Sequence, residues 1–292
     1  MTAAFALLLA ILIWASNSIM VKVVLREITP LTLTWLRFLL AALFYVPFAA
    51  VTWRRAPRYT PREWALLVGA GVALVPVFSL TLYWALIYTS VANTALVRMT
   101  EPAWVLLLGA VLLGERASRR QLAGLALALV GTAALALLGR QPSVSGDDHM
   151  LGMAFMVANS LAWVVYILCF KNLLLRHRVT QVTVHAALAG SAVLFLITGP
   201  THATDIAREA AAMRPFAWVL VVAMALVVTI GSNQLFSYGL QRVTAGAAAA
   251  YSYLTPVLAA VLAWLFLGEP ITAVVVVCGV VIAAGVYLLN RA

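Results

Sequence analysis

Residues 102–115 read PAWVLLLGAVLLGE, and residues 256–269 read PVLAAVLAWLFLGE. In both segments a proline is followed twelve positions later by Gly-Glu, and the residues between them are apolar or small. A glycine directly after an apolar run is typical of the end of a helix. The two segments lie 154 positions apart, which indicates that one structural unit occurs twice in the chain.

Other residues recur at similar offsets, and one modest insertion in the second half reconciles the values. The matches are Trp14 with Trp163 and Lys22 with Lys171 at 149 positions, and Gly131 with Gly285 at 154 positions. We therefore expect two copies of a five-helix unit, residues 1–140 and residues 151–292.

The composition is typical of a protein embedded in a membrane. Of the 292 residues, 65% are hydrophobic and 10% are charged, and the mean hydropathy is +1.04. A soluble domain carries about 25% charged residues, so most of this surface must face lipid. The net charge of +10 lies mainly in short connectors, which indicates membrane topology and argues against nucleic-acid binding. Cys169 and Cys278 lack metal-ligand spacing, so we expect no metal or other cofactor.

Ten apolar runs predict ten membrane-spanning helices. A helix needs about 20 mostly apolar residues to cross the hydrocarbon core. Such runs lie at 3–24, 32–53, 64–87, 92–113, 121–139, 151–170, 182–199, 215–240, 247–267 and 272–289. No Lys or Arg precedes the first run, so we interpret it as a span and not as a signal peptide.

The distribution of charge predicts the orientation. Most of the 19 Lys and Arg residues lie in connectors on the side of the two termini, whereas Asp147 and Glu209 lie on the other side. The positive-inside rule therefore places both termini in the cytoplasm. Because five is an odd number, the second copy must be inverted. Inverted repeats are common in secondary transporters, although a duplicated scaffold without transport is the alternative.

Several motifs together resemble one known family. They are Trp14-Ala-Ser-Asn17, Leu36-Arg37-Phe38 and the two Pro-x11-Gly-Glu segments. The combination is similar to the EamA family of the drug/metabolite transporter superfamily, over nearly the whole chain, and most resembles its aromatic amino acid exporters. The resemblance implies ten helices around a central cavity, in the cell inner membrane. The cavity would be lined largely by the first, third, fourth, sixth, eighth and ninth helices.

The fourth span carries two charges, Arg98 and Glu101, three positions apart. Charges inside a span are costly, at about 2.5–3.5 kcal/mol each, so they are expected to face the protein interior or a watery cavity. Arg98 would bind a substrate carboxylate, and Glu101 an ammonium group or a coupling proton. Alternatively the two side chains pair with each other, or Arg98 extends to the membrane interface.

The matching face of the ninth span is polar but uncharged. At the offset of 154, Glu101 corresponds to Thr255 and Arg98 to Ser252, and Tyr251 lies beside them. This difference predicts a site that binds one part of a zwitterion through charge and the other through hydrogen bonds. Hydrogen bonds from Ser252 and Thr255 to carbonyls of their own helix are the alternative.

The third and eighth spans repeat this pattern. Ser79 and Tyr83 correspond to Asn233 and Ser237, again with each pair on one helical face. Such polar groups need partners in a membrane, so they are expected to line the cavity or to bond to neighbouring helices. Pro76 lies near the middle of the third span and predicts a bend there.

Aromatic residues in the first and sixth spans complete the candidate substrate site. Trp163 corresponds to Trp14, and Tyr166 and Asn17 each follow their tryptophan by one turn. Stacking on an apolar part of a substrate is one interpretation, and ordinary helix packing is the other.

Four further residues are interpreted as structural. Gly268 should end its helix, and the glutamate that follows it, Glu269, should lie at the surface. For Arg37, near the end of the second span, pairing or extension to the interface is favoured over contact with substrate. His185 in the seventh span is expected to be a packed histidine.

The sequence thus predicts an exporter of amino acids and related metabolites that works by alternating access. The alternative within transport is an exporter of drugs or cations, coupled to protons through Glu101. The chain has no nucleotide-binding P-loop and none of the common hydrolase motifs, so an enzyme is not expected. The expected partners are a small-molecule substrate and the lipid bilayer, with no nucleic acid. A monomer is expected because the duplication supplies both halves of a pathway.

Overall fold

The structure is a computed structural model. It describes residues 2–53, 58–104, 118–140, 146–174, 176–232, 235–236, 238 and 254–290. These residues form helices joined by short turns, and no strand occurs among them, so the all-helical fold class is confirmed.

Two compact units divide the chain. The first contains Met1–Ile19, Trp84–Leu161 and Gln234–Ala292, and the second contains Met20–Tyr83 and Ala162–Asn233. Each unit therefore takes segments from both expected halves of the sequence. Helices α1 (Ala3–Val24) and α8 (Gly146–Leu174) contribute to both units.

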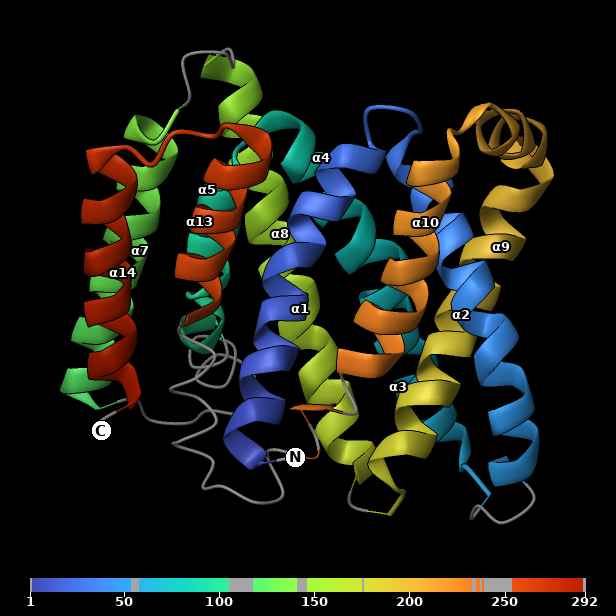
Figure 1. Ribbon diagram of the computed structural model, residues 1–292. Coiled ribbons are helices and arrows are strands. Elements are labelled where there is room, and N and C mark those ends of the chain that lie inside the picture. The colour runs from blue at the N-terminus through green and yellow to red at the C-terminus, as the bar shows by residue number, and fades with distance from the viewer. Residues whose placement is uncertain are drawn as a thin grey trace. The chain divides into compact units, whose positions relative to one another are not determined.

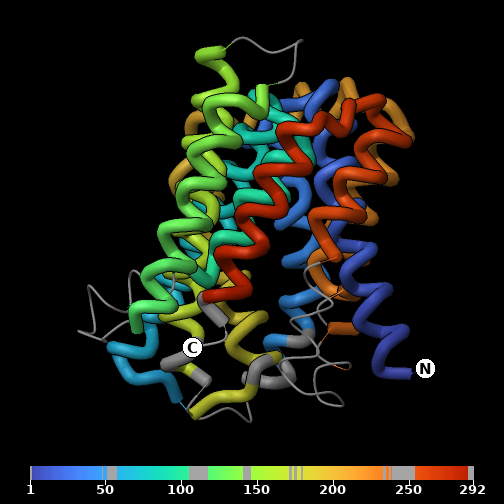
Figure 2. Tube along the Cα trace, turned by 90° about the vertical axis from the view of Figure 1, so that its left-hand side faces the viewer, coloured from blue at the N-terminus to red at the C-terminus, as the bar shows by residue number. Residues whose placement is uncertain are grey.

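In the first unit, two helix pairs join distant parts of the sequence. The helices are α5 (Val91–Arg98), α7 (Arg119–Leu138), α13 (Leu254–Leu267) and α14 (Ala273–Asn290). Helix α7 packs along α14, and α5 packs on α13 (Figures 1 and 2). Glycines bring the first pair together, because a Cβ on Gly131 would lie 2.7 Å from Cγ1 of Ile282. A Cβ on Gly285 would lie 2.5 Å from the nitrogen of Ala128.

The second unit is built around α9. Its other helical elements are α2 (Pro30–Trp53), α3 (Pro61–Val72), η1 (Ala73–Phe78), the first half of α4 (Ser79–Tyr88), α10 (Pro215–Ala223) and η2 (Met224–Gly231). Helix α9 (Val179–Ala212) packs on both α2 and α3, while α10 and η2 pack on α2 (Figure 1). The segments η1 and η2 are π-helical, and Pro76 lies in η1. The wider π turn accommodates a proline, which lacks a backbone N–H.

Local sequence signals set several helix ends. Thr60 and Glu63 form a capping box at the start of α3, in which each side chain bonds to the other residue's backbone N–H. Gly268 ends α13 with a φ of 69°, and the N–H of Glu269 bonds back to the carbonyl of Ala263. The N–H of Gly268 also bonds to the carbonyl of Trp264, four residues back, which is the αL type of helix end and confirms the expected role of Gly268.

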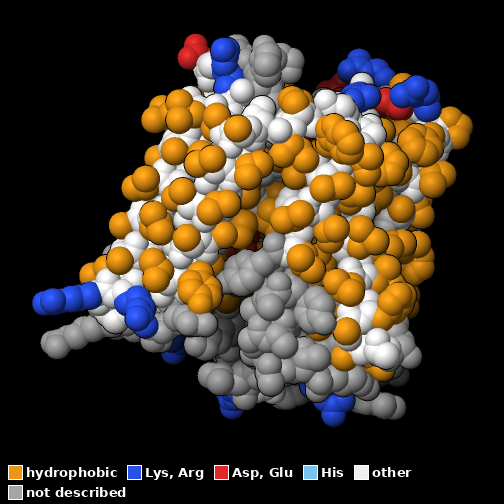
Figure 3. Space-filling view, turned by 60° about the vertical axis from the view of Figure 1, so that its left-hand side comes forward, with side chains coloured by type: hydrophobic (Ala, Val, Ile, Leu, Met, Phe, Trp, Pro, Cys, Tyr) orange, Lys and Arg blue, Asp and Glu red, His pale blue; other side chains and the backbone are white. Residues whose placement is uncertain are grey.

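Several of the described helices have the length and composition of membrane spans. Six of them are long and apolar enough to cross a bilayer, and three shorter ones are apolar as well. Hydrophobic side chains cover most of the visible face in Figure 3, with Lys and Arg at its upper and lower margins. Each of the ten predicted spans overlaps at least one described helix.

The seventh span differs from its prediction. We expected it to end at residue 199, but α9 continues through Pro200 to Ala212. Asp205 and Glu209 therefore lie on a helical extension and not in a loop. The extension is largely exposed, so turn and charge signals there marked the end of the apolar run and not the end of the helix.

Candidate functional site

The fourth span is interrupted where its two charges lie. We expected one helix over 92–113, but α5 ends at Arg98. The N–H groups of Met99 and Thr100 bond three residues back, to Leu96 and Val97, and residues 101–104 are helical again. Pro102 explains the break, because it cannot donate to the carbonyl of Arg98 and its ring would clash there.

Arg98 and Glu101 face each other across this break. Nε of Arg98 lies 3.3 Å from Oε1 of Glu101, and the two side chains are 37% and 18% exposed. Their predicted proximity is confirmed, although a turn and not a continuous helical face creates it. Thr100 lies between them, where its hydroxyl donates to the carbonyl of Val97 and accepts from the indole of Trp104.

Glu269 holds the other end of α5. We expected this residue at the surface, but it is buried, and its Oε2 accepts a hydrogen bond of 2.9 Å from the N–H of Val91. The prediction was wrong because the glycine turn directs the chain after α13 onto the first turn of α5. A carboxylate there satisfies a free N–H and complements the helix dipole.

Only part of the remaining candidate site lies among the described residues. Asn17 is buried on α1, and Thr255 is half-buried at the start of α13. Four candidates lie outside the described residues: Tyr251, Ser252, Asn233 and Ser237. The comparison of the fourth and ninth spans, residue by residue, therefore stays a prediction.

In the second unit, Tyr83 is fully buried and bonded to Arg37. Nη1 of Arg37 donates to the hydroxyl of Tyr83 at 2.9 Å, and its Nε donates to the hydroxyl of Thr229 in η2 at 3.0 Å. Pairing of Arg37, as expected from its position, is confirmed. Ser79 is also buried, and its hydroxyl donates to the carbonyl of Leu74 at 3.5 Å. Polar contacts within the protein therefore involve both predicted residues.

Trp163 and Tyr166 pack in an aromatic row. The ring of Trp163 lies 5.4 Å from that of Phe78 and 5.2 Å from that of Tyr166, which in turn lies 5.1 Å from Phe170. Tyr166 belongs to a buried cluster formed by α3, η1, α8 and α9, and Trp163 packs against it. Helix packing thus occupies both rings.

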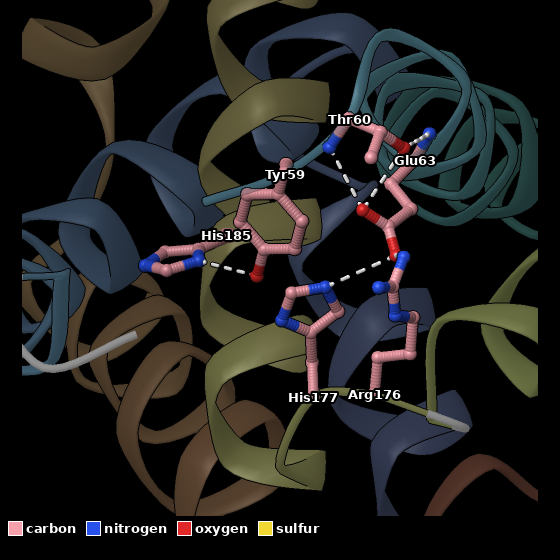
Figure 4. A network of polar contacts seen from close by, with 6 residues as sticks. All are labelled: Tyr59, Thr60, Glu63, Arg176, His177 and His185. Atoms are coloured by element: carbon pink, nitrogen blue, oxygen red, sulfur yellow. Dashed lines mark hydrogen bonds and ion pairs between the residues drawn. The ribbon is translucent and has the colours of Figure 1, made fainter. Parts of the chain in front are cut away.

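A polar cluster that the sequence had not indicated fixes the start of α3 (Figure 4). We call Thr60, Glu63, Arg176 and His177 the α3 clamp. Oε2 of Glu63 accepts hydrogen bonds from the backbone and hydroxyl of Thr60, at 2.8 and 3.0 Å. Its Oε1 lies 3.5 Å from Nη1 of Arg176 and 3.5 Å from Nε2 of His177. The α8–α9 connection is thereby joined to α3.

A second cluster lies at the opposite end of α2. We call Glu27, Thr29, Glu209 and Arg214 the α10 clamp. Oε2 of Glu27 accepts from the N–H of Arg214 at 2.9 Å, and Oε1 accepts from its Nε at 2.7 Å. Glu209 accepts from the N–H and hydroxyl of Thr29, at 2.8 and 3.0 Å. The α1–α2 connection is thereby joined to the end of α9 and the start of α10.

The α10 clamp should loosen in acid. Hydrogen bonds from the backbone and side chain of Arg214 hold the pKa of Glu27 below the usual glutamate range. The clamp's stabilisation is therefore complete above about pH 4.3 and is lost as pH falls through the lowered pKa. We expect hydrogen-exchange protection of the Arg214 amide to fall in that range. Glu27→Gln should show low protection that does not change with pH, and a pH-dependent loss in this variant would contradict the assignment.

Comparison with known proteins places the chain in a family. The model of the EamA-like transporter family matches residues 1–137 and again residues 150–291. The chain belongs to the EamA-like transporter family. This membership confirms the resemblance drawn from the tryptophan, Arg-Phe and Gly-Glu motifs. The chain is accordingly an EamA-like transporter and a multi-pass membrane protein.

Its relatives match over nearly their whole length. An "Uncharacterized transporter" of Archaeoglobus fulgidus is 29% identical, covering 97% of this chain and 95% of that protein. A "Probable terminal-alkyne amino-acid exporter" of Streptantibioticus cattleyicolor is 28% identical, with coverage of 99% and 93%. A "Probable amino-acid metabolite efflux pump" of Escherichia coli K12 is 28% identical, with coverage of 96% and 92%. These names describe a transporter, an exporter and an efflux pump, and none of the three describes an enzyme.

One solved crystal structure has the same fold. It superposes with a TM-score of 0.62 at 21% sequence identity, covering 99% of this chain and 96% of that one. At this level of identity the likeness concerns the helical EamA-like fold alone.

Proposed function

We propose that this EamA-like transporter exports amino acids, including aromatic or other apolar ones, and related small metabolites by alternating access. Two relatives that match over more than nine-tenths of their length carry names for the export of amino acids or amino-acid metabolites. The chain would act as a monomer in the cell inner membrane, with both termini in the cytoplasm. The orientation follows from the excess of Lys and Arg in the connectors on that side.

Reciprocal packing supports two inverted five-helix repeats, residues 1–140 and 151–292, around a central cavity. Gly131 faces Ile282, and Gly285 faces Ala128. At the offset of 154, Gly131 corresponds to Gly285 and Ala128 corresponds to Ile282. The first contact therefore turns into the second when the two repeats are exchanged, as a two-fold axis requires. The paired positions also run in opposite directions, so α7 and α14 are antiparallel.

Helix contacts in the second unit follow the same exchange. Helix α3 packs on α9, and α10 packs on α2. If α2 corresponds to α9 and α3 corresponds to α10, then one contact is the counterpart of the other. The family match over two separate ranges also favours a duplication.

The interrupted fourth span is the observation that carries the proposal. Discontinuous helices in transporters expose backbone groups and charges at the substrate site. Here the break holds Arg98, Glu101 and the buried Thr100. Arg98 would bind the carboxylate of an amino acid, and Glu101 its ammonium group. The proposed substrate-binding residues are Asn17, Ser79, Tyr83, Arg98, Glu101, Trp163, Tyr166, Asn233, Ser237, Tyr251, Ser252 and Thr255.

The Arg98–Glu101 contact favours a zwitterion over a cation. A site for drugs or other cations would need a carboxylate whose charge is available to the substrate. In this structure Arg98 partly neutralises Glu101 at 3.3 Å. A zwitterion can exchange one ion pair for two, because each of its charged groups meets an opposite charge in the site.

Counterflow in liposomes tests the proposal. Purified protein is reconstituted in liposomes loaded with one unlabelled amino acid, and entry of the same labelled amino acid is followed. We expect transient accumulation with apolar or aromatic amino acids, and none in protein-free liposomes. Accumulation of organic cations alone would favour the alternative exporter. Failure of every metabolite to accumulate, with the protein still folded, would refute transport of this kind.

A further inference from the structure

The two clamps occupy corresponding positions in the repeat. Pro61 and Trp64 at the start of α3 match Pro215 and Trp218 at the start of α10, each at an offset of 154. The connection before α2 likewise matches the connection before α9, since residue 27 plus 149 is residue 176. Each clamp therefore joins the same two parts of the repeat, at opposite ends of α2.

The charges of the two clamps are reversed. Glu27 before α2 is an anion that binds the cationic Arg214. In the corresponding place before α9 stands the cation Arg176, which faces the anionic Glu63. At the offset of 154, however, Arg214 corresponds to Thr60 and Glu63 to Ala217. Each clamp therefore contains an ion pair, but its partner at the helix start occupies a different position in each repeat.

The α3 clamp differs from the α10 clamp in having a buried histidine at its centre. The side chain of His177 is 1% exposed, and its ring lies 4.3 Å from the ring of Tyr59. Neither ring nitrogen forms a hydrogen bond to another described residue. A buried nitrogen without a partner is costly, and Nε2 lies 3.5 Å from the Glu63 carboxylate, where a proton on that nitrogen would have an acceptor.

Hydrogen bonds from Thr60 hold the Glu63 carboxylate with one oxygen towards His177. Its Oε2 is held by the two hydrogen bonds from Thr60, which leaves Oε1 for Arg176 and His177. The Arg176 side chain is 68% exposed, so water screens its charge. The charge of His177 would be buried, and its attraction to Glu63 would be screened far less.

Four titratable or charged groups surround His177. Glu63 and Tyr59 approach from α3 and the residues before it, Arg176 precedes it in the chain, and His185 approaches from α9 (Figure 4). The Tyr59 hydroxyl lies 2.8 Å from Nδ1 of His185. Burial, and then the carboxylate of Glu63, raises the pKa of Tyr59, so this phenol stays neutral. Cys169 of α8 and Tyr59 pack against the same buried cluster.

We propose that the α3 clamp is a proton-operated lock, in which proton uptake by His177 fastens the α8–α9 connection to the start of α3 through Glu63. Helix α3 continues through η1 into α4, so fastening its first turn restrains this long helix against α9. On the orientation proposed above the lock lies on the cytoplasmic side, and acid there slows transport. That last consequence rests on the proposed export function, whereas the lock itself does not.

Hydrogen exchange of the whole protein tests the lock without any substrate. Protection factors for the amides of residues 176–182 are measured between about pH 7.5 and 5.5, after correction for the intrinsic pH dependence of exchange. We expect protection to rise by up to about tenfold towards acid, since one proton is linked to the contact. His177→Gln should abolish this rise. Glu63→Gln should abolish it too, while an amide keeps the capping box.

Two control variants distinguish proton uptake by His177 from effects of another histidine or of the Arg176 charge. His202→Gln removes an exposed histidine of the α9 extension and should leave the rise unchanged. Arg176→Gln removes the permanent charge and should keep the pH dependence. A flat profile in the wild type, or a rise that persists in His177→Gln, would refute the lock.

A transport measurement tests the consequence. Counterflow is measured at constant external pH while the pH on the cytoplasmic face is varied. We expect the wild-type rate to fall in acid by several-fold and the His177→Gln rate to stay level. An equal response in both proteins would refute control of transport by His177. If no amino acid is transported by either protein, the proposed function fails, and the exchange result still decides the lock.

Discussion

Glu101→Gln should lower the rate of amino-acid counterflow by about tenfold or more. The substitution removes the carboxylate that lies 3.3 Å from Arg98 and leaves the guanidinium charge beside a neutral amide within the membrane. Removing one member of a buried pair costs about 3–5 kcal/mol. Because Arg98 is 37% exposed, we expect a smaller effect, near the 1.4 kcal/mol that corresponds to a tenfold change.

Asp205→Asn is a matched control for this substitution. Asp205 also pairs with an arginine three positions away, Arg208, at 2.9 Å, but both side chains are more than half exposed. Loss of such a pair costs at most about 1 kcal/mol, and the α9 extension carries no proposed site residue. We therefore expect an unchanged transport rate in Asp205→Asn.

The dependence of rate on substrate concentration distinguishes binding from folding. If Glu101 binds the ammonium group, Glu101→Gln should raise the KM for amino acids while the fraction of folded protein stays the same. A carboxylic acid without the amino group should lose less affinity than the amino acid does. Wild-type kinetics and wild-type pH dependence in Glu101→Gln would remove this residue from the mechanism.

The helical architecture could be predicted because hydrophobicity determines it almost alone. The apolar runs predicted the first span at residues 3–24, and α1 covers Ala3–Val24. Lipid supplies no hydrogen bonds, so a continuous apolar run of about 20 residues that crosses it satisfies its backbone groups as a helix. The extension of α9 to Ala212 was missed because it lies beyond the apolar run, where hydropathy carries no information.

The sequence contains a signal for the break in the fourth span. Pro102 belongs to the motif that aligns the two repeats, and it also interrupts the helix. A proline removes the hydrogen bond to the carbonyl four residues earlier, which is that of Arg98. The helix end at Arg98 therefore follows from the sequence, and it separates the two charges into different helical segments.

The two clamps and the contact of Glu269 with α5 could not be predicted from the sequence. Each depends on which connection lies beside which helix end, and this is a property of tertiary structure. Glu63 did have a local signal, because Thr60-x-x-Glu63 is a capping box. The match of Pro61 and Trp64 with the start of α10 would have related the two clamps, but it cannot indicate that Arg176 and His177 reach Glu63.

Gly71→Ala should be among the most destabilising single substitutions in the second unit. A Cβ on Gly71 would lie 2.6 Å from the nitrogen of Gly190 on α9, and closer still to the carbonyl oxygen of Ala186. Both atoms belong to the backbone, so relief requires that α3 and α9 move apart. Overpacking of this kind costs about 1–3 kcal/mol or more, and the rigid neighbours favour the upper end.

Gly69→Ala provides the contrast within the same helix. Its Cβ would lie 3.7 Å from Sγ of Cys169, an ordinary contact, and alanine is the better helix former by about 1 kcal/mol. We therefore expect the two substitutions to have opposite signs. The half-life of the detergent-solubilised protein at elevated temperature should shorten in Gly71→Ala and stay equal or lengthen in Gly69→Ala.

Gly190→Ala extends the argument to the facing helix. A Cβ there would clash with the carbonyl group of Gly71, so each alanine forces the same separation of α3 and α9. Once one alanine has separated the helices, the second should cost less, and the double variant should lose less stability than the sum of the single losses. Additive losses would show that the two glycines act independently. Equal stability of Gly69→Ala and Gly71→Ala would contradict the close approach itself.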